Sequence, residues 1–73
     1  MKRSIVKIKE KYVPGMRIRL IKMNDIQALP SGTEGNVFGV DNTGSIMVSW
    51  DTGDSLNIIP EVDEIEIISM NIE

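Results

Sequence analysis

The chain of 73 residues contains no cysteine and no histidine. Their absence excludes disulfides, a thiol nucleophile, an imidazole base and a zinc site built from nitrogen or sulfur ligands. Small secreted domains usually compensate for a thin core with disulfides, so we expect a reducing compartment, the cytoplasm. No apolar run approaches the roughly 20 residues of a membrane-spanning helix, and lysines interrupt any signal-like segment near the N-terminus. We expect no membrane contact, metal or cofactor.

Catalytic motifs are missing as well. Asp51 and Asp54 flank a turn, where aspartate is favoured for local hydrogen bonds rather than for catalysis. The acidic segment 61–66 lacks the spacing of a calcium loop, and no Lys-Ser/Thr follows Gly32 and Gly35 as it would in a phosphate-binding loop. The sequence therefore predicts a protein that is not an enzyme.

Charges of the two signs occupy different parts of the chain. The net charge is −3, but all 8 basic residues lie within residues 1–22, and from Asp25 onward every charged residue is acidic. Such asymmetry is typical of a nucleic-acid-binding arm on an acidic body, or of two segments that pair with each other or with a second subunit. The candidates for contact with phosphates are Lys2, Arg3, Lys7, Lys9, Lys11, Arg17 and Arg19.

Apolar residues mostly alternate with polar ones, and glycine, proline, asparagine or aspartate interrupts the alternation at short intervals. This pattern predicts a small all-β fold. Residues 1–11, in which Val6 and Ile8 alternate with Lys7 and Lys9, are expected to form a basic arm or an extra edge strand ahead of a domain spanning 12–73. The expected strands are 16–21, 35–40, 45–50, 54–59 and 64–68, with a long loop over 24–32.

The hairpin around residues 51–53 has one register that keeps its apolar residues together. A three-residue loop with Gly53 in the left-handed region places Ile46, Val48 and Trp50 on one face with Leu56 and Ile58. In this register Trp50 is a core residue rather than a ligand-binding one. The facing pairs are Trp50 with Asp54, Val48 with Leu56 and Ile46 with Ile58.

The preceding hairpin indicates a candidate binding surface. A four-residue loop places Val37 opposite Val48 in the core and Phe38 opposite Met47 on the outer face, with a bulge at Gly39 that lets Val40 turn inward. Large apolar side chains on an outer face often mark a partner surface, and a base could also stack on Phe38. The alternative is that the N-terminal segment or the loop over 24–32 covers them. Tyr12 either caps one end of the fold or lines a groove beside it.

The first and last strands are expected to be neighbours. Arg17 and Arg19 then meet Glu64 and Glu66 on the solvent face, while Ile18 and Leu20 meet Ile65 and Ile67 in the core. Such cross-strand pairs contribute about 0.2–1 kcal/mol each. Five short strands whose terminal strands touch form a small, partly open barrel.

Three motifs in order resemble a known family. They are Tyr12-Val13-Pro14-Gly15-Met16-Arg17-Ile18-Arg19-Leu20, then Pro30-x-Gly32-Thr33-x-Gly35-x-Val37-x-Gly39-Val40, and Val48-x-Trp50-Asp51-x-Gly53-x-x-Leu56. This arrangement is similar to the domain of unknown function 4314 family, short proteins common in Gram-positive bacteria, their phages and conjugative elements, and more widely to SH3-like barrels of the KOW type. The resemblance covers residues 12–68 and implies a five-stranded SH3-like barrel. It implies no activity and assigns no functional residues.

These observations lead to two functional hypotheses. The first is a non-enzymatic interaction module of a bacterial or phage accessory protein, which binds a protein partner or itself through Phe38, Met47 and Tyr12. The alternative is nucleic-acid binding by the basic N-terminal arm together with Arg17 and Arg19.

Overall fold

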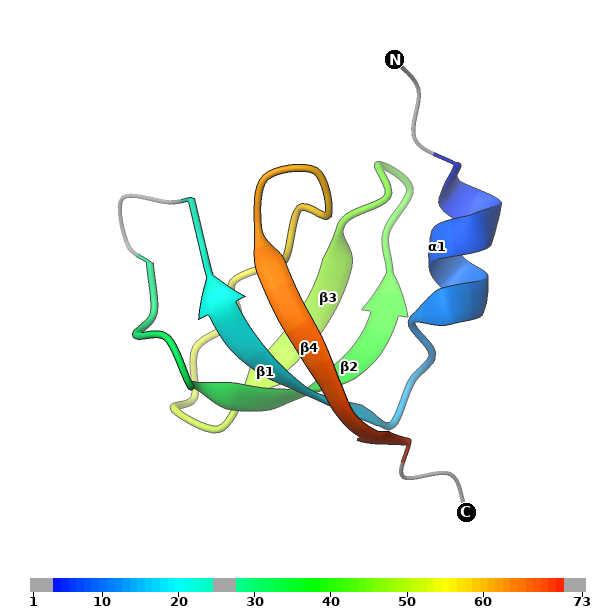
Figure 1. The fold of residues 1–73 in the computed structure, drawn as a ribbon. Helices are drawn as coiled ribbons and strands as arrows, with labels where there is room; N and C mark the ends of the chain where they lie inside the picture. The colour runs from blue at the N-terminus through cyan, green and yellow to red at the C-terminus, as the bar shows by residue number, and fades with distance from the viewer. Residues whose placement is uncertain (1–3, 25–27, 71–73) are drawn as a thin grey trace.

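The computed structural model describes residues 4–24 and 28–70 and shows a curled antiparallel sheet with one short helix beside it (Figure 1). The sheet is not closed, and its strand order is β3-β2-β1-β4, so the last strand lies beside the first as expected. The predicted mostly β fold is therefore confirmed. The elements are α1 (Ile5–Lys11), β1 (Met16–Lys22), β2 (Glu34–Val40), β3 (Ile46–Trp50) and β4 (Glu64–Met70).

Within the described residues, the strand predicted over 54–59 does not form. Its register was correct at both ends, because Trp50 N donates to Asp54 O at 3.2 Å and Ile58 forms a single bridge with Ile46. Gly53 also adopts the predicted left-handed conformation, with φ of 93°. Between these two points, however, the indole Nε1 of Trp50 donates to the carbonyl oxygen of Leu56 at 2.8 Å. The Leu56 carbonyl thus accepts a hydrogen bond from a side chain and not from the backbone of a neighbouring strand. The described residues therefore form four strands, and the prediction of a fifth over 54–59 is wrong.

Residues 5–11 form a helix and not the edge strand or free arm that the alternation suggested. Ile5, Ile8 and Tyr12 have the i, i+3, i+7 spacing of a helix face, and Ile8 and Tyr12 pack against the core. The amide of Tyr12 donates to Ile8 O at 2.9 Å where the helix ends. The helical period prevailed because it buries apolar side chains against the sheet. Lys2 and Arg3 of the predicted arm, and residues 25–27 of the predicted loop, lie outside the described residues.

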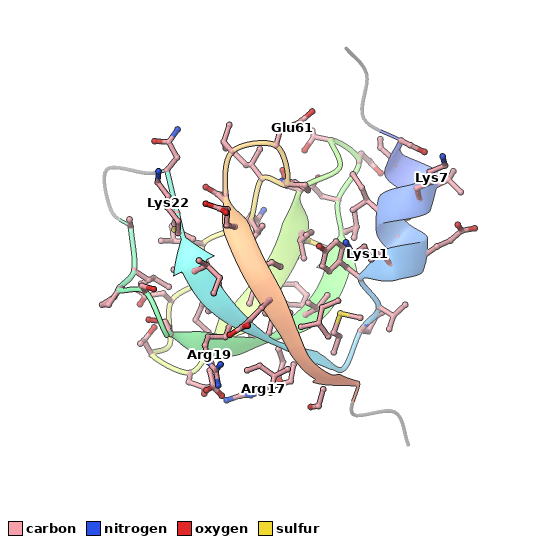
Figure 2. The ribbon with its side chains drawn as sticks, in the orientation of Figure 1. Lys7, Lys11, Arg17, Arg19, Lys22 and Glu61 are labelled. Carbon is pink, nitrogen blue, oxygen red and sulfur yellow. The ribbon has the colours of Figure 1, made fainter. Side chains whose placement is uncertain are left out.

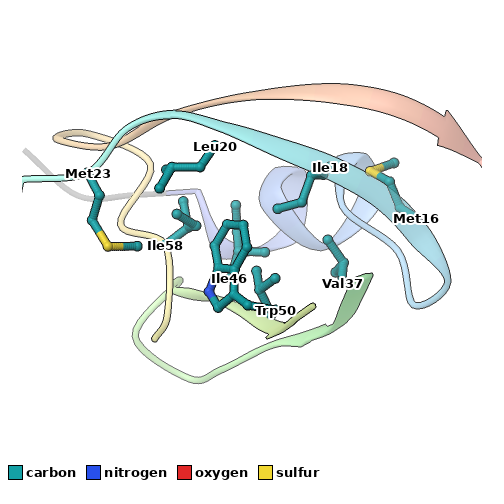
Figure 3. Packing of buried hydrophobic residues seen from close by; sticks show 9 residues of the cluster. Met16, Ile18, Leu20, Met23, Val37, Ile46, Trp50 and Ile58 are labelled. Atoms are coloured by element: carbon teal, nitrogen blue, oxygen red, sulfur yellow. The ribbon is translucent and has the colours of Figure 1, made fainter. Parts of the chain in front are cut away.

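The core lies inside the curl of the sheet, between β1 and β4 on one side and β2 and β3 on the other (Figure 3). Trp50 is 2% exposed, which confirms its prediction as a core residue. Inward residues alternate with Arg17 and Arg19 along β1, as the sequence indicated. The buried apolar side chains are Met16, Ile18, Leu20, Met23, Val37, Ile46, Val48, Trp50 and Ile58.

The β2–β3 hairpin contains the predicted pair of Val37 with Val48 and a register shift between Val37 and Gly39. The shift brings Gly39, not Phe38, opposite Met47, so the predicted direct pairing of Phe38 with Met47 is wrong by one residue. The extra residue also lets Val40 pair with Ile46 and pack against the core, as the predicted bulge required.

The β1–β4 ladder confirms three of the predicted neighbours and corrects one. Ile18 pairs with Ile67, Leu20 with Ile65 and Arg19 with Glu66. Ile65 packs against the core, but Ile67 on the edge strand is 42% exposed, so its predicted core position is wrong. Register shifts on either side of this stretch place Ser69 opposite Arg17 and Lys22 opposite Glu64. Glu64 is therefore not a partner of Arg17, because in an antiparallel pair that sets Arg19 opposite Glu66 the residues before Glu66 face those after Arg19.

Candidate partner-binding surface

The outer face of the sheet carries a network of two arginines and three carboxylates. Arg19 Nη1 lies 2.7 Å from Glu66 Oε1, and Arg19 Nη2 lies 3.4 Å from Glu34 Oε2. Arg17 Nη2 lies 3.4 Å from the other oxygen of Glu34, and both nitrogens of its guanidinium group bind Asp51, with Nη1 to Oδ1 at 2.9 Å. Glu34 thus stands between the two arginines, and the network joins β1, β2, β4 and the turn after β3.

The paired charges shift each other's ionisation. The hydrogen bond from Arg17 lowers the pKa of Asp51, and Asp51 in turn raises the pKa of Arg17. Hydrogen bonds to Glu66 and Glu34 raise the pKa of Arg19. Arg17 and Arg19 were candidates for phosphate contact, and the structure places both in ion pairs with carboxylates of the same chain.

We expect the pair of Arg17 and Asp51 to make stability depend on pH in the acid range. Because the folded-state pKa of Asp51 is lowered, its stabilising contribution is present above the ordinary aspartate pKa of about 3.9 and disappears as the pH falls through the folded-state value. Arg17→Met should therefore lower the urea midpoint at about pH 6 and have much less effect at about pH 3. A midpoint difference that stays constant over this range would contradict the ion pair, and Asp51→Asn should reproduce the result.

Phe38 lies on this same outer face and is 54% exposed. Met47 on the neighbouring strand is half-buried. A Cβ atom placed on Gly39 would lie only 2.8 Å from Met47 Cε, so the methionine methyl group covers the glycine backbone next to Phe38. Phe38 and Met47 thus lie on neighbouring strands, with Gly39 opposite the methionine, and we call the two residues the Phe38/Met47 patch.

Tyr12, the third predicted partner-binding residue, has a different setting. Its ring packs against the core and is half-buried. Lys11 Nζ lies 5.3 Å from the ring centroid, within the range of a cation–π interaction. Tyr12 therefore fastens the end of α1 to the sheet.

The basic side chains are spread over the molecule. Lys7 and Lys11 belong to α1 at one side of the molecule, Arg17 and Arg19 lie together below the sheet, and Lys22 lies on the side away from α1 (Figure 2). The predicted phosphate-binding residues of the described segments thus form no single surface. The lysines among them are Lys7, Lys9 and Lys11, all exposed on α1.

Two features of this surface escaped the sequence analysis. Arg17 pairs with Asp51 in the turn after β3 and with Glu34 on β2. No local sequence pattern links either acid to Arg17. The helical placement of the lysines had a signal, the Ile5, Ile8 and Tyr12 spacing, which competes with the alternation of Val6 to Lys9.

In the segments that the structure describes, no three acidic side chains gather as a metal site would require. No helix in those segments is long and apolar enough to cross a membrane.

The fold and surface define a small, mostly β domain with an open four-stranded sheet and a helix at its side. The family model described as Domain of unknown function (DUF4314) matches residues 1–68, and the chain belongs to this family. The match begins ahead of Tyr12, so it includes the segment that forms α1 and that the three motifs leave out. No curated protein and no solved structure matches the chain.

Proposed function

We propose that this protein is a non-enzymatic interaction module that binds a protein partner, or a second copy of itself, through the Phe38/Met47 patch. The observation that carries the proposal is the 54% exposure of Phe38 on a face whose other outward side chains are mostly polar or charged. Aromatic residues and methionine are enriched where proteins meet. Absence of cysteine supports a cytoplasmic setting for this binding.

We further propose that the fold is an SH3-like, partly open barrel. The strand order supports this, since a meander of three strands is followed by a last strand that returns beside the first. The bridge between Ile46 and Ile58 stands on the free edge of β3, at the position a fifth strand would occupy. A fold of this kind is compatible with many ligands, so the proposed function is argued from the Phe38/Met47 patch and not from the barrel.

Replacing Phe38 and Met47 together with serine should abolish partner binding and change the free energy of unfolding by only about 1 kcal/mol, the usual range for modest surface changes. The measurement is photo-crosslinking in an extract of the native host, with a benzophenone amino acid at the exposed Ser49 of β3. We expect a crosslinked species that the double variant loses. Sedimentation of the purified chain shows whether that species is a second copy.

Val62→Ser provides the matched control, because Val62 is 45% exposed and lies in the turn ahead of β4. It should leave the crosslinked species unchanged. Two results would contradict the proposal: crosslinking that survives the double substitution, or a loss of several kcal/mol, which would place the patch in the core.

Nucleic-acid binding is the second candidate function, and the three exposed lysines of α1 favour it. The discriminating measurement is titration of labelled DNA and RNA oligonucleotides at two salt concentrations, since phosphate contacts weaken strongly with salt. Absence of salt-dependent binding at low salt excludes this candidate.

A further inference from the structure

Helix α1 presents positive charge that no described carboxylate pairs with, although Lys11 also lies over the Tyr12 ring. Lys7, Lys9 and Lys11 are exposed and take part in no ion pair within segments 4–24 and 28–70, although the body of the chain is acidic. Lys7 and Lys11 are four residues apart, a spacing at which like charges destabilise a helix. The helix has only 7 residues and one acid, Glu10. The helix dipole favours Lys9 and Lys11 in the last turn, and the net positive charge of the helix remains available to an acidic ligand.

The positive helix contacts β2, the strand that carries Phe38. Gly15 N donates to Val37 O at 2.9 Å, and β1 begins at the following residue. The residues of β2 after Val37 therefore have no partner in β1, and α1 lies beside this end of β2 instead (Figure 1). Phe38 thus lies where the sheet gives way to the lysine-bearing helix.

The acids nearest to the patch have partners within the chain. Asp41, just beyond β2, accepts hydrogen bonds from the amides of Thr43 and Ser45, both at 2.9 Å, and from Thr43 Oγ1 at 2.7 Å. Glu34 and Asp51 are paired with the arginines. With three lysines and one acid, Glu10, the helix that contacts β2 therefore carries net positive charge.

We propose that the partner docks with an acidic segment, which places an apolar side chain on Phe38 and Met47 and directs aspartate or glutamate side chains toward Lys7 and Lys11. This inference rests on the proposed function and names the chemistry of its ligand. A protein segment fits better than nucleic acid because the methionine offers no stacking surface. Arginine, which binds phosphate in bidentate fashion, is here held by carboxylates.

The test is a selection of random twelve-residue peptides displayed on phage against the full chain at low salt. We expect the selected peptides to carry a leucine, methionine or aromatic residue flanked by aspartate and glutamate. A synthetic copy of one such peptide is then titrated against variants. Phe38→Ser should abolish binding, and Lys7→Glu with Lys11→Glu should weaken it about tenfold and reduce its salt dependence. Lys22→Glu is the control, because Lys22 lies away from α1 (Figure 2) and should leave the affinity unchanged.

Other outcomes overturn the inference in distinguishable ways. Selected peptides with neutral or basic flanks that still depend on Phe38 would refute the acidic ligand and leave the proposed function standing. Failure to select any peptide that depends on Phe38 would overturn both. Salt-dependent binding of single-stranded DNA that Lys7→Glu with Lys11→Glu abolishes, without acidic peptides, would assign the helix to nucleic acid.

Discussion

Replacing Ile46 with alanine should lower the free energy of unfolding by about 2–5 kcal/mol, the range for truncating a fully buried aliphatic side chain. Ile46 is 0% exposed, pairs with Val40 at the start of β3 and exchanges both backbone hydrogen bonds with Ile58. It therefore joins the sheet to the segment that fails to become a fifth strand. Because so small a domain has little stability in reserve, the variant should be largely unfolded at room temperature.

Urea denaturation followed by the fluorescence of Trp50, the single tryptophan, measures this loss. Ile67→Ala is the matched control, since Ile67 has the same side chain on the edge strand β4 and is 42% exposed. It should cost about 1 kcal/mol or less. Equal losses at the two positions would show that the core does not lie inside the curl.

Gly35→Ala should destabilise the protein by about 1–3 kcal/mol, the usual cost of overpacking. A Cβ atom at Gly35 would lie 2.8 Å from Ser49 O, 2.9 Å from Val48 Cγ1 and 3.0 Å from Trp50 Cα. Two of these atoms belong to the backbone of β3 and cannot move without separating the strands. Glycine is therefore required at position 35, because β2 and β3 approach each other too closely there to leave room for a side chain.

Gly39→Ala on the same strand is the control for this substitution. Its Cβ atom would also approach a neighbour to 2.8 Å, but the neighbour is Met47 Cε, the free end of a flexible side chain. The methyl group can rotate away, so we expect a stability loss well below that of Gly35→Ala in the same denaturation experiment. A loss at Gly39 as large as at Gly35 would mean that Met47 is fixed in place by packing.

The elements that form the proposed binding surface differ in how far the sequence predicted them. Alternation along β2 was enough to predict that Phe38 points outward while Val37 enters the core, because side chains of a strand alternate between faces. The position of Met47 beside it depended on the bulge at Gly39, which the need to bury Val40 already indicated. The Ile5, Ile8 and Tyr12 spacing indicated a helix that carries the lysines, but no sequence signal indicated that this helix contacts β2.

The sequence by itself determined the four strands, the turn at Gly53, the core position of Trp50 and the pairing of Arg19 with Glu66. Each follows from local periodicity or from the demand that apolar side chains share one face. Tertiary structure alone decided between strand and helix for residues 5–11, whose apolar residues fit both periods until Ile8 and Tyr12 found the core. It also decided the partner of Arg17, because the antiparallel register places Glu64 opposite Lys22 and the turn after β3 brings Asp51 within reach of Arg17. The positive charges of the described residues are therefore used in two ways: Arg17 and Arg19 pair with carboxylates of the same chain, and the lysines of α1 are exposed to solvent.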